Sequence, residues 1–163
     1  MPPCVRTAAA FVALLAGPAV ACPGPDWVAP PYWGEVTFSF HSGLSNLAMS
    51  SRAGGIFNLR DCGLEGEGLT GYRGDGLIRI RPSLLVHWHG DAAQLVIGTE
   101  FEEATLLLVH DPEGRWLFDD GLGHDPLVTI EAPPAGDYAI FLGTHGTSRF
   151  TDPGTLIVSE TGP

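Results

Sequence analysis

Short apolar segments alternate with polar and turn-forming clusters along most of the chain. Val36, Phe38 and Phe40 alternate with polar residues, which is typical of a strand with one buried face. Residues 105–110 carry apolar side chains on both faces, which favours a strand covered on both sides. Ten segments have strand-like patterns: 35–40, 55–59, 77–81, 84–88, 94–99, 105–110, 115–118, 127–131, 138–143 and 155–159. Residues 41–50 read either as a loop or as a further short strand.

Glycine and proline separate these segments. They account for 22 and 14 of the 163 residues, which is roughly 22% against an average of about 12%. Clusters such as 111–114 (Asp-Pro-Glu-Gly) and 152–154 (Asp-Pro-Gly) have the composition of turns. No helical period is visible between the turns. The pattern therefore predicts an all-β fold, a two-sheet antiparallel β-sandwich.

Residues 1–21 have the parts of a secretory signal peptide in the expected order. Arg6 supplies a positive charge, an apolar stretch too short to span a bilayer follows, and residues 19–21 (Ala-Val-Ala) form a small-x-small cleavage pattern. The 142 residues left after removal (163 minus 21) suit one domain. We expect a Pro/Trp-rich N-terminal segment over residues 22–34 and a single domain over 35–163. No transmembrane segment is expected, and the protein is predicted to be periplasmic or extracellular.

Two cysteines, Cys22 and Cys62, remain in the mature chain, because Cys4 leaves with the signal peptide. Two cysteines in an exported protein most simply form one disulfide. Cys22 also follows the cleavage pattern directly, as the acylated cysteine of a lipoprotein does. Ala19 stands where such a signal usually has leucine. A disulfide and a lipid anchor on Cys22 are therefore both open, and the disulfide is favoured.

The charge of the chain excludes one class of partner. All 8 basic residues are arginines and 19 residues are acidic, so the net charge is −11. Removing Arg6 with the signal peptide makes it −12 (7 minus 19). Binding to nucleic acid depends on basic side chains that contact phosphates. We therefore expect no nucleic-acid partner.

Part of this acidity is concentrated in one segment of 15 residues. It holds Asp111, Glu113, Asp119, Asp120 and Asp125. If the flanking strands bring these carboxylates together, they supply the oxygen ligands that Ca²⁺ prefers, and the five residues form a candidate calcium site. The spacing is not that of an EF-hand loop. Aspartate before proline or glycine also stabilises turns. Calcium binding and turn formation both remain open, with turn formation favoured.

Other side chains suggest chemistry less strongly. His87 and His89 share one face of a predicted strand and would need a third ligand to hold Zn²⁺ or Cu²⁺. The chain has no G-x-S-x-G or H-E-x-x-H motif. We therefore assign no catalytic residue and no cofactor-binding residue, and we expect the protein not to be an enzyme.

The aromatic residues allow two interpretations. Trp27, Tyr32, Trp33, Trp88 and Trp116 either form a stacking platform for a sugar or pack against the strands. Packing is favoured, because Trp116 lies inside a predicted hairpin strand. One of Trp27, Tyr32 and Trp33 is expected to hold the N-terminal segment against the domain.

Several motifs of the second half occur together in a known family. They are D-P-x-G at 111–114, an acidic pair at 119–120 and P-A-G-D-Y at 134–138. In these motifs, residues 104–146 resemble the pre-peptidase C-terminal (PPC) domain family. The Ala-Gly-Gly turn at 53–55 is similar to that of small exported bacterial proteins of the same type. The resemblance implies a jelly-roll-like β-sandwich that assists secretion, substrate contact or localisation.

These observations predict a non-enzymatic, exported β-sandwich that acts as a binding or interaction module. Its ligand would be a protein or a glycan. Calcium would stabilise the module only if the acidic segment binds calcium in addition to forming turns. A secreted hydrolase and a periplasmic protein that binds divalent metal are the alternatives.

Overall fold

The computed structural model describes residues 22–38, 46–89, 92–146 and 148–161. The predicted signal peptide, residues 1–21, lies outside the described residues. The chain forms eleven strands and one 3₁₀ helix in these ranges: β1 (Glu35–Phe38), β2 (Asn46–Ser51), β3 (Phe57–Asn58), η1 (Leu59–Cys62), β4 (Gly76–Ile78), β5 (Leu84–Trp88), β6 (Gln94–Glu100), β7 (Thr105–His110), β8 (Trp116–Asp119), β9 (Leu127–Glu131), β10 (Gly136–His145) and β11 (Gly154–Thr161).

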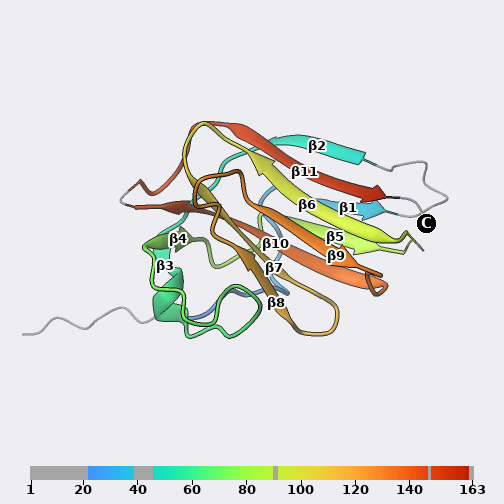
Figure 1. Cartoon of the computed structure of the whole chain (residues 1–163), viewed down its shortest axis with the longest axis horizontal. Helices are drawn as coiled ribbons and strands as arrows, with labels where there is room; N and C mark the ends of the chain where they lie inside the picture. The colour runs from blue at the N-terminus through green and yellow to red at the C-terminus, as the bar shows by residue number, and fades with distance from the viewer. Residues whose placement is uncertain (1–21, 39–45, 90–91, 147, 162–163) are drawn as a thin grey trace, which may run out of the picture.

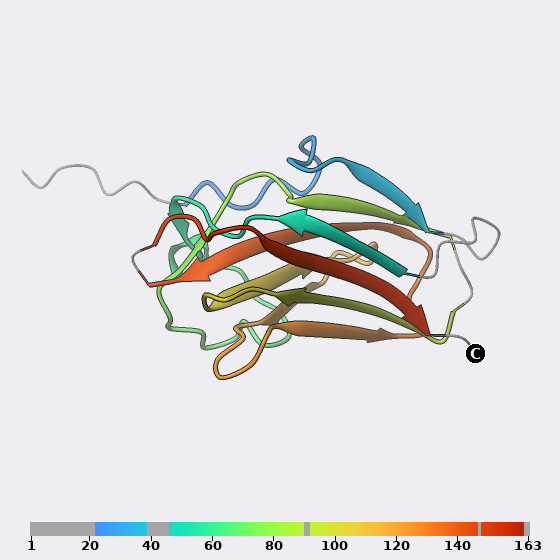
Figure 2. The ribbon, with the colours of Figure 1, turned by 90° about the horizontal axis from the view of Figure 1, so that it is seen from above.

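The strands form two sheets that pack as the layers of one sandwich (Figures 1 and 2). The smaller sheet has the order β2-β11-β6-β9. In the larger sheet, the long strand β10 pairs with β5 and β4 along one edge and with β7 along the other. β1 extends this sheet beyond β5, β3 beyond β4, and β8 beyond β7. The prediction of an all-β sandwich is confirmed.

Strand β7 lies inside the larger sheet and is covered on both faces. Leu107 and Val109 belong to the main core between the two sheets. Leu106 and Leu108 belong to a second core on the opposite face. The segment from η1 to Tyr72 covers that face, and Figure 1 shows it in green on the side away from the smaller sheet. Residues 105–110 are therefore apolar on both faces because both faces are covered, as predicted.

The boundaries differ from the predicted ones in a few places. Residues 46–51 form β2, which settles part of the ambiguous segment, whereas 39–45 lie outside the described residues. The predicted strand 55–59 is reduced to the two residues of β3, because η1 begins at Leu59 with Asn58 as its N-cap. The side chain of Asn58 accepts a hydrogen bond from the Arg60 amide at 3.2 Å, so a local polar contact replaces strand pairing.

One strand pair is not antiparallel. β1 runs parallel to β5, with Glu35 opposite Leu85 and Phe38 opposite Trp88. Only strands joined by a tight turn must be antiparallel. Three strands separate β1 from β5 in the sequence, so no hairpin constrains their direction.

None of the described helices is long and apolar enough to cross a membrane.

The motifs at 111–114 and 134–138 have local structural roles. Gly114 lies at φ 80° in the β7–β8 turn, where its amide donates to the Asp111 carbonyl at 3.0 Å. The hydroxyl of Tyr138 donates to the carbonyl of Pro134 at 2.8 Å and closes the turn before β10. Gly136 packs against Pro112, and a Cβ at this position would lie 2.6 Å from the proline Cβ. These motifs therefore brace two turns against each other at one end of the larger sheet.

Candidate functional site

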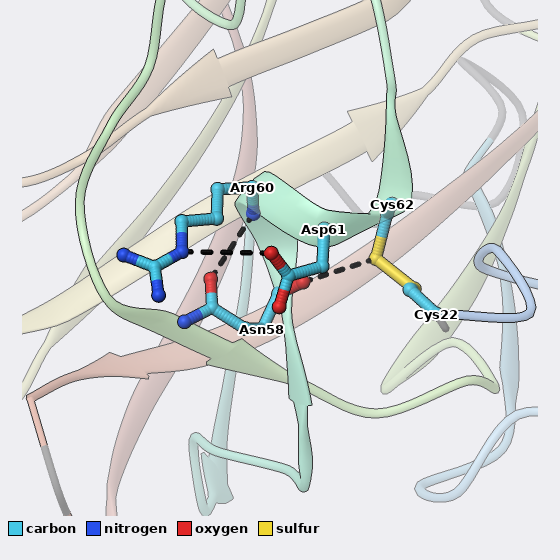
Figure 3. Close-up of a disulfide and its surroundings, with 5 residues drawn as sticks. All are labelled: Cys22, Asn58, Arg60, Asp61 and Cys62. Carbon is cyan, nitrogen blue, oxygen red and sulfur yellow. Dashed lines mark hydrogen bonds and ion pairs between the residues drawn. A yellow bond between two sulfur atoms is a disulfide. The ribbon is translucent and has the colours of Figure 1, made fainter. Parts of the chain in front are cut away.

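The N-terminal segment is tied covalently to the edge of the larger sheet. Cys22 and Cys62 form a disulfide with a Cα–Cα distance of 4.7 Å (Figure 3). Cys62 is the last residue of η1, so the bond holds the segment beside β3. With its sulfur in this bond, Cys22 has no thiol left to carry a lipid. The disulfide, rather than the lipid anchor, is therefore the interpretation that the structure supports.

Backbone hydrogen bonds then align this segment with the chain that joins β4 to β5. The amides of Asp26 and Tyr32 donate to the carbonyls of Ile80 (2.7 Å) and Pro82 (2.9 Å), and the Trp33 amide donates to Ser83 at 2.8 Å. The side chains add a second attachment. Trp27 stacks on His110 with ring centroids 4.4 Å apart, and His110 in turn contacts Trp116. The predicted aromatic attachment of the segment is confirmed.

This alignment brings together a cluster of arginines and exposed apolar side chains, which we call the arginine–aromatic patch. Its members are Tyr32, Trp33, Ile56, Arg79, Arg81 and Phe150. The Arg79 guanidinium carbon lies 4.5 Å from the ring centroid of Tyr32 and 5.0 Å from that of Phe150. Arg81 lies 4.3 Å from the Tyr32 ring. Such cation–π contacts fix the guanidinium groups without neutralising them.

Arg79 and Arg81 differ from the two ion-paired arginines in what they contact. Arg60 pairs with Asp75 at 2.8 Å and Arg115 with Asp111 at 2.7 Å. Among the described residues, Arg79 and Arg81 make no ion pair with a carboxylate. Burial lowers the pKa of the Arg79 guanidinium, because its charge is partly removed from water. Arg52, Arg73 and Arg149 also have no ion pair among the described residues, but the guanidinium groups that lie against aromatic rings there are those of Arg79 and Arg81. Their two charges are thus held in place and left without a carboxylate.

A pocket of about 320 Å³ opens beside these arginines. Its lining residues are Tyr32, Gly55, Ile56, Phe57, Arg79, Ile80 and Phe150. A second pocket, of about 440 Å³, shares Ile56 and Phe57 with the first and extends to Asn58, Asp61 and Cys22. Ile56 and Phe150 are 60% and 48% exposed, which is high for side chains of this size and class. The two pockets adjoin at Ile56 and Phe57, and the second is also lined by the charged side chains of Asp61 and Arg149.

The Ala-Gly-Gly turn explains why three distant segments meet here. Gly54 forms an isolated β-bridge to Phe150, and the Gly55 amide donates to the Arg149 carbonyl at 2.8 Å. The next amide, of Ile56, donates to Ile78 at 3.1 Å. A Cβ on Gly54 would overlap the Arg149 carbonyl, and one on Gly55 would overlap that of Ile78. The two glycines therefore allow the backbone approach that builds the pocket.

The predicted calcium ligands are distributed over the two ends of β8. Asp111 and Glu113 lie in the turn before this strand, whereas Asp119, Asp120 and Asp125 lie at or beyond its far end. The four steps from Arg115 to Asp119 span about 13 Å of extended backbone. The part of the chain that the structure describes contains no group of three or more His, Cys, Asp or Glu residues placed to hold a metal ion. Calcium binding by this segment stays a prediction.

At the near end, Asp111 is fully buried and acts within the turn. Its carboxylate accepts hydrogen bonds from the amides of Glu113 (3.0 Å) and Arg115 (2.8 Å). Its second oxygen accepts from Arg115 Nε at 2.7 Å, while Glu113 pairs with another nitrogen of the same guanidinium at 3.0 Å. These bonds neutralise the buried carboxylate, as a buried charge requires.

At the far end, the acids stabilise the β8–β9 connection. Asp119 accepts hydrogen bonds from the amides of Gly121 (3.0 Å) and Leu127 (2.8 Å), and Asp120 accepts from Leu122 at 3.1 Å. Asp125 is exposed, and its backbone carbonyl accepts from His124. These contacts are the turn chemistry that the sequence offered as the alternative to calcium.

His87 lies on the partly exposed face of β5 and His89 follows the end of that strand, but His87 is already held by carboxylates. Its Nδ1 lies 2.7 Å from Asp137 Oδ1 and its Nε2 lies 3.2 Å from Glu35 Oε2. These residues come from the strands on either side of β5. The hydrogen bond with Asp137, followed by that with Glu35, raises the pKa of His87. The arrangement is a charge-paired histidine across three strands.

We expect these contacts to make stability depend on pH. Because the pKa of His87 is raised on folding, its contribution is present below its ordinary pKa and is lost as pH rises through the folded-state value. The pairs are exposed, so the effect is about 0.2–1 kcal/mol. Urea unfolding should show that His87→Gln costs more stability at pH 5.5 than at pH 8.5. His89→Gln is the control, and an equal cost of His87→Gln at both pH values would contradict the assignment.

The aromatic platform does not form from the five residues considered in the sequence. Trp88 is fully buried and Trp116 nearly so, and both pack in the cores, whereas Trp27, Tyr32 and Trp33 are exposed on the N-terminal segment. Sequence reasoning did not single out Arg79, Arg81, Ile56 or Phe150 for binding. The available signal was the alternation at 78–81, which places two arginines on one face of a strand-like segment.

No family model and no curated protein matches the chain. Among solved structures, it is similar to the crystal structure of Aeromonas hydrophila PliG, a periplasmic lysozyme inhibitor of g-type lysozyme. The two share 14% sequence identity with a TM-score of 0.43, over 78% of this chain and 96% of that one. At this level of similarity, the function of the chain has to be derived from its own residues.

Proposed function

We propose that this protein is a non-enzymatic, exported binding module of the PPC type, and that it contacts a protein partner through the arginine–aromatic patch. The observation that carries the proposal is the pair of guanidinium groups of Arg79 and Arg81. They are held against exposed rings and are left without carboxylate partners among the described residues. Arginine, tyrosine and tryptophan are the residues that dominate binding energy at protein interfaces. The disulfide supports an oxidising compartment.

The environments of His87 and His110 support a binding role over hydrolysis. A histidine base needs one ring nitrogen for the nucleophile and often the other for an orienting group. In His87 both nitrogens contact carboxylates. In His110 the ring lies between Trp27 and Trp116, and burial lowers its pKa. These side chains hold strands and the N-terminal segment together.

Site-specific photo-cross-linking tests the proposal. Phe150 is replaced by photoreactive benzoylphenylalanine, and the protein is irradiated with the exported proteins of its source. We expect covalent adducts from this position, and fewer when Arg79→Ala and Arg81→Ala are added, because these charges hold the partner at the patch. The control places the same group at Thr129, which is exposed on β9 of the smaller sheet. Equal adducts at both positions, or none at position 150, would contradict the proposal.

A further inference from the structure

The contacts of Arg79 determine which chemical group the patch offers to a ligand. Tyr32 and Phe150 lie against the guanidinium at 4.5 and 5.0 Å, and Trp33 lies 5.9 Å away. A guanidinium is planar and its N–H donors lie in that plane, so contacts between rings and its central carbon do not use these donors. Donors in this geometry match the two oxygens of a carboxylate. Because three rings already restrict Arg79, little side-chain freedom is lost when an anion binds.

The space next to this charge is apolar. Gly55, Ile56, Phe57, Ile80 and Phe150 line the pocket of about 320 Å³ together with the aliphatic and aromatic parts of Arg79 and Tyr32. A cavity of about 150 Å³ is large enough for benzene. The pocket therefore has room for one aromatic or branched aliphatic side chain. The second pocket continues past Ile56 and Phe57 toward Asn58 and Cys22, which provides a path for extended backbone.

We propose that the patch binds an extended acidic segment of its protein partner, with a carboxylate on Arg79 and Arg81 and a neighbouring apolar side chain in the pocket. This ligand class rests on the function proposed above. This mode of binding requires the arginine charge and the apolar pocket to act together. Tyr32, Arg79 and Phe150 belong to both, because they line the pocket and also form the cation–π contacts.

The same contacts favour a peptide over an acidic sugar. A sugar ring binds by stacking on an exposed aromatic face. Here the guanidinium groups of Arg79 and Arg81 both lie over the ring of Tyr32, and that of Arg79 also lies over the ring of Phe150. These ring faces are therefore already in contact with arginine. The pocket beside them is lined mainly by aliphatic and aromatic carbon, which leaves sugar hydroxyl groups without partners. An apolar side chain has no such cost.

Fluorescence anisotropy with defined peptides tests the ligand class. The probe is a fluorescein-labelled peptide of ten residues with one phenylalanine between two glutamates in a glycine/serine background. Two matched peptides replace both glutamates by glutamine or the phenylalanine by alanine. We expect each replacement to weaken binding by about tenfold or more, which corresponds to one lost strong contact. An oligogalacturonate of similar charge serves as the competing acidic sugar.

Protein variants locate the binding. Arg79→Ala is expected to weaken binding of the probe peptide by about tenfold or more. Arg79→Lys should recover only part of this affinity, because lysine keeps the charge without the planar pair of donors. Arg73→Ala removes an exposed arginine outside the patch and should leave binding unchanged. Unfolding midpoints of all variants are measured in parallel, so that loss of binding is read only from folded protein.

The outcomes separate this inference from the proposed function. Binding that is indifferent to Arg79→Ala, or equal for all three peptides, overturns the inference. Patch-dependent binding of the oligogalacturonate without binding of the peptides overturns it in favour of a glycan. If no peptide binds although cross-linking from position 150 traps a partner, the ligand class is wrong and the binding role stands. If both experiments fail, both proposals fall.

Discussion

Reduction of the Cys22–Cys62 disulfide is expected to lower the free energy of unfolding by about 4 kcal/mol. The bond closes a loop with a sequence separation of 40 residues, and the chain-entropy estimate for a loop of this length is about 4 kcal/mol. Total stabilities of domains are about 5–15 kcal/mol, so this is a large fraction. Urea unfolding of the oxidised protein with and without reductant measures the loss. The Cys22→Ser, Cys62→Ser double variant should have the same free energy of unfolding as the reduced protein, and reductant should not change it.

The same reduction should have a local effect under native conditions. The disulfide fixes the start of the N-terminal segment, and the amides of Tyr32 and Trp33 then bond to Pro82 and Ser83. Hydrogen exchange at these two amides should accelerate more than exchange in β7, which is buried on both faces. If stability changes by less than about 1 kcal/mol, the loop-closure account is wrong. If the two amides exchange as in the oxidised protein, the segment is held without the disulfide.

Gly54→Ala is expected to destabilise the protein by about 3 kcal/mol or more, since two costs add. Gly54 has φ 119°, where a side chain is strained, and a Cβ would overlap the Arg149 carbonyl. Gly71→Ala is the matched control. Gly71 has φ 85° with nothing within 4 Å of an added Cβ, so only the backbone cost of about 1–2 kcal/mol applies.

Urea unfolding of the two variants measures this difference directly. Failure of Gly54→Ala to fold under conditions where Gly71→Ala folds leads to the same conclusion. Equal costs would show that the backbone near Arg149 can move aside. In that case the Ala-Gly-Gly turn would not be what holds Ile56, Arg79 and Phe150 around the pocket.

Much of the sandwich could be predicted because strand signals are local. Alternation marked β1, and the doubly apolar run marked β7 as a strand covered on both faces. The departures occur where one contact competes with strand pairing. Asn58 caps η1 and ends β3 after two residues. β1 pairs in parallel with β5, a choice that depends on which strand lies beside it rather than on its own residues.

The candidate sites show the limit of sequence distance as a guide. The five acids from Asp111 to Asp125 are close in sequence, but β8 separates them into two turns because an extended strand carries its ends apart. Tyr32, Arg79 and Phe150 are far apart in sequence, but they meet around one guanidinium. The spacing of residues along the sequence could reveal neither the separation of the five acids nor the meeting of Tyr32, Arg79 and Phe150.

The sequence by itself determined the fold class and most strand positions, and it favoured a disulfide over a lipid anchor, because apolar alternation, turn residues and the number of cysteines can be read without knowing the tertiary structure. The tertiary structure alone decided what the exposed residues do. It placed the N-terminal segment along residues 80–83, and it brought Arg149 and Phe150 against Gly54 and Gly55. Those contacts depend on long-range packing and on glycines that allow backbones to touch. They bring scattered arginines and aromatic residues together in the patch that we propose as the binding surface.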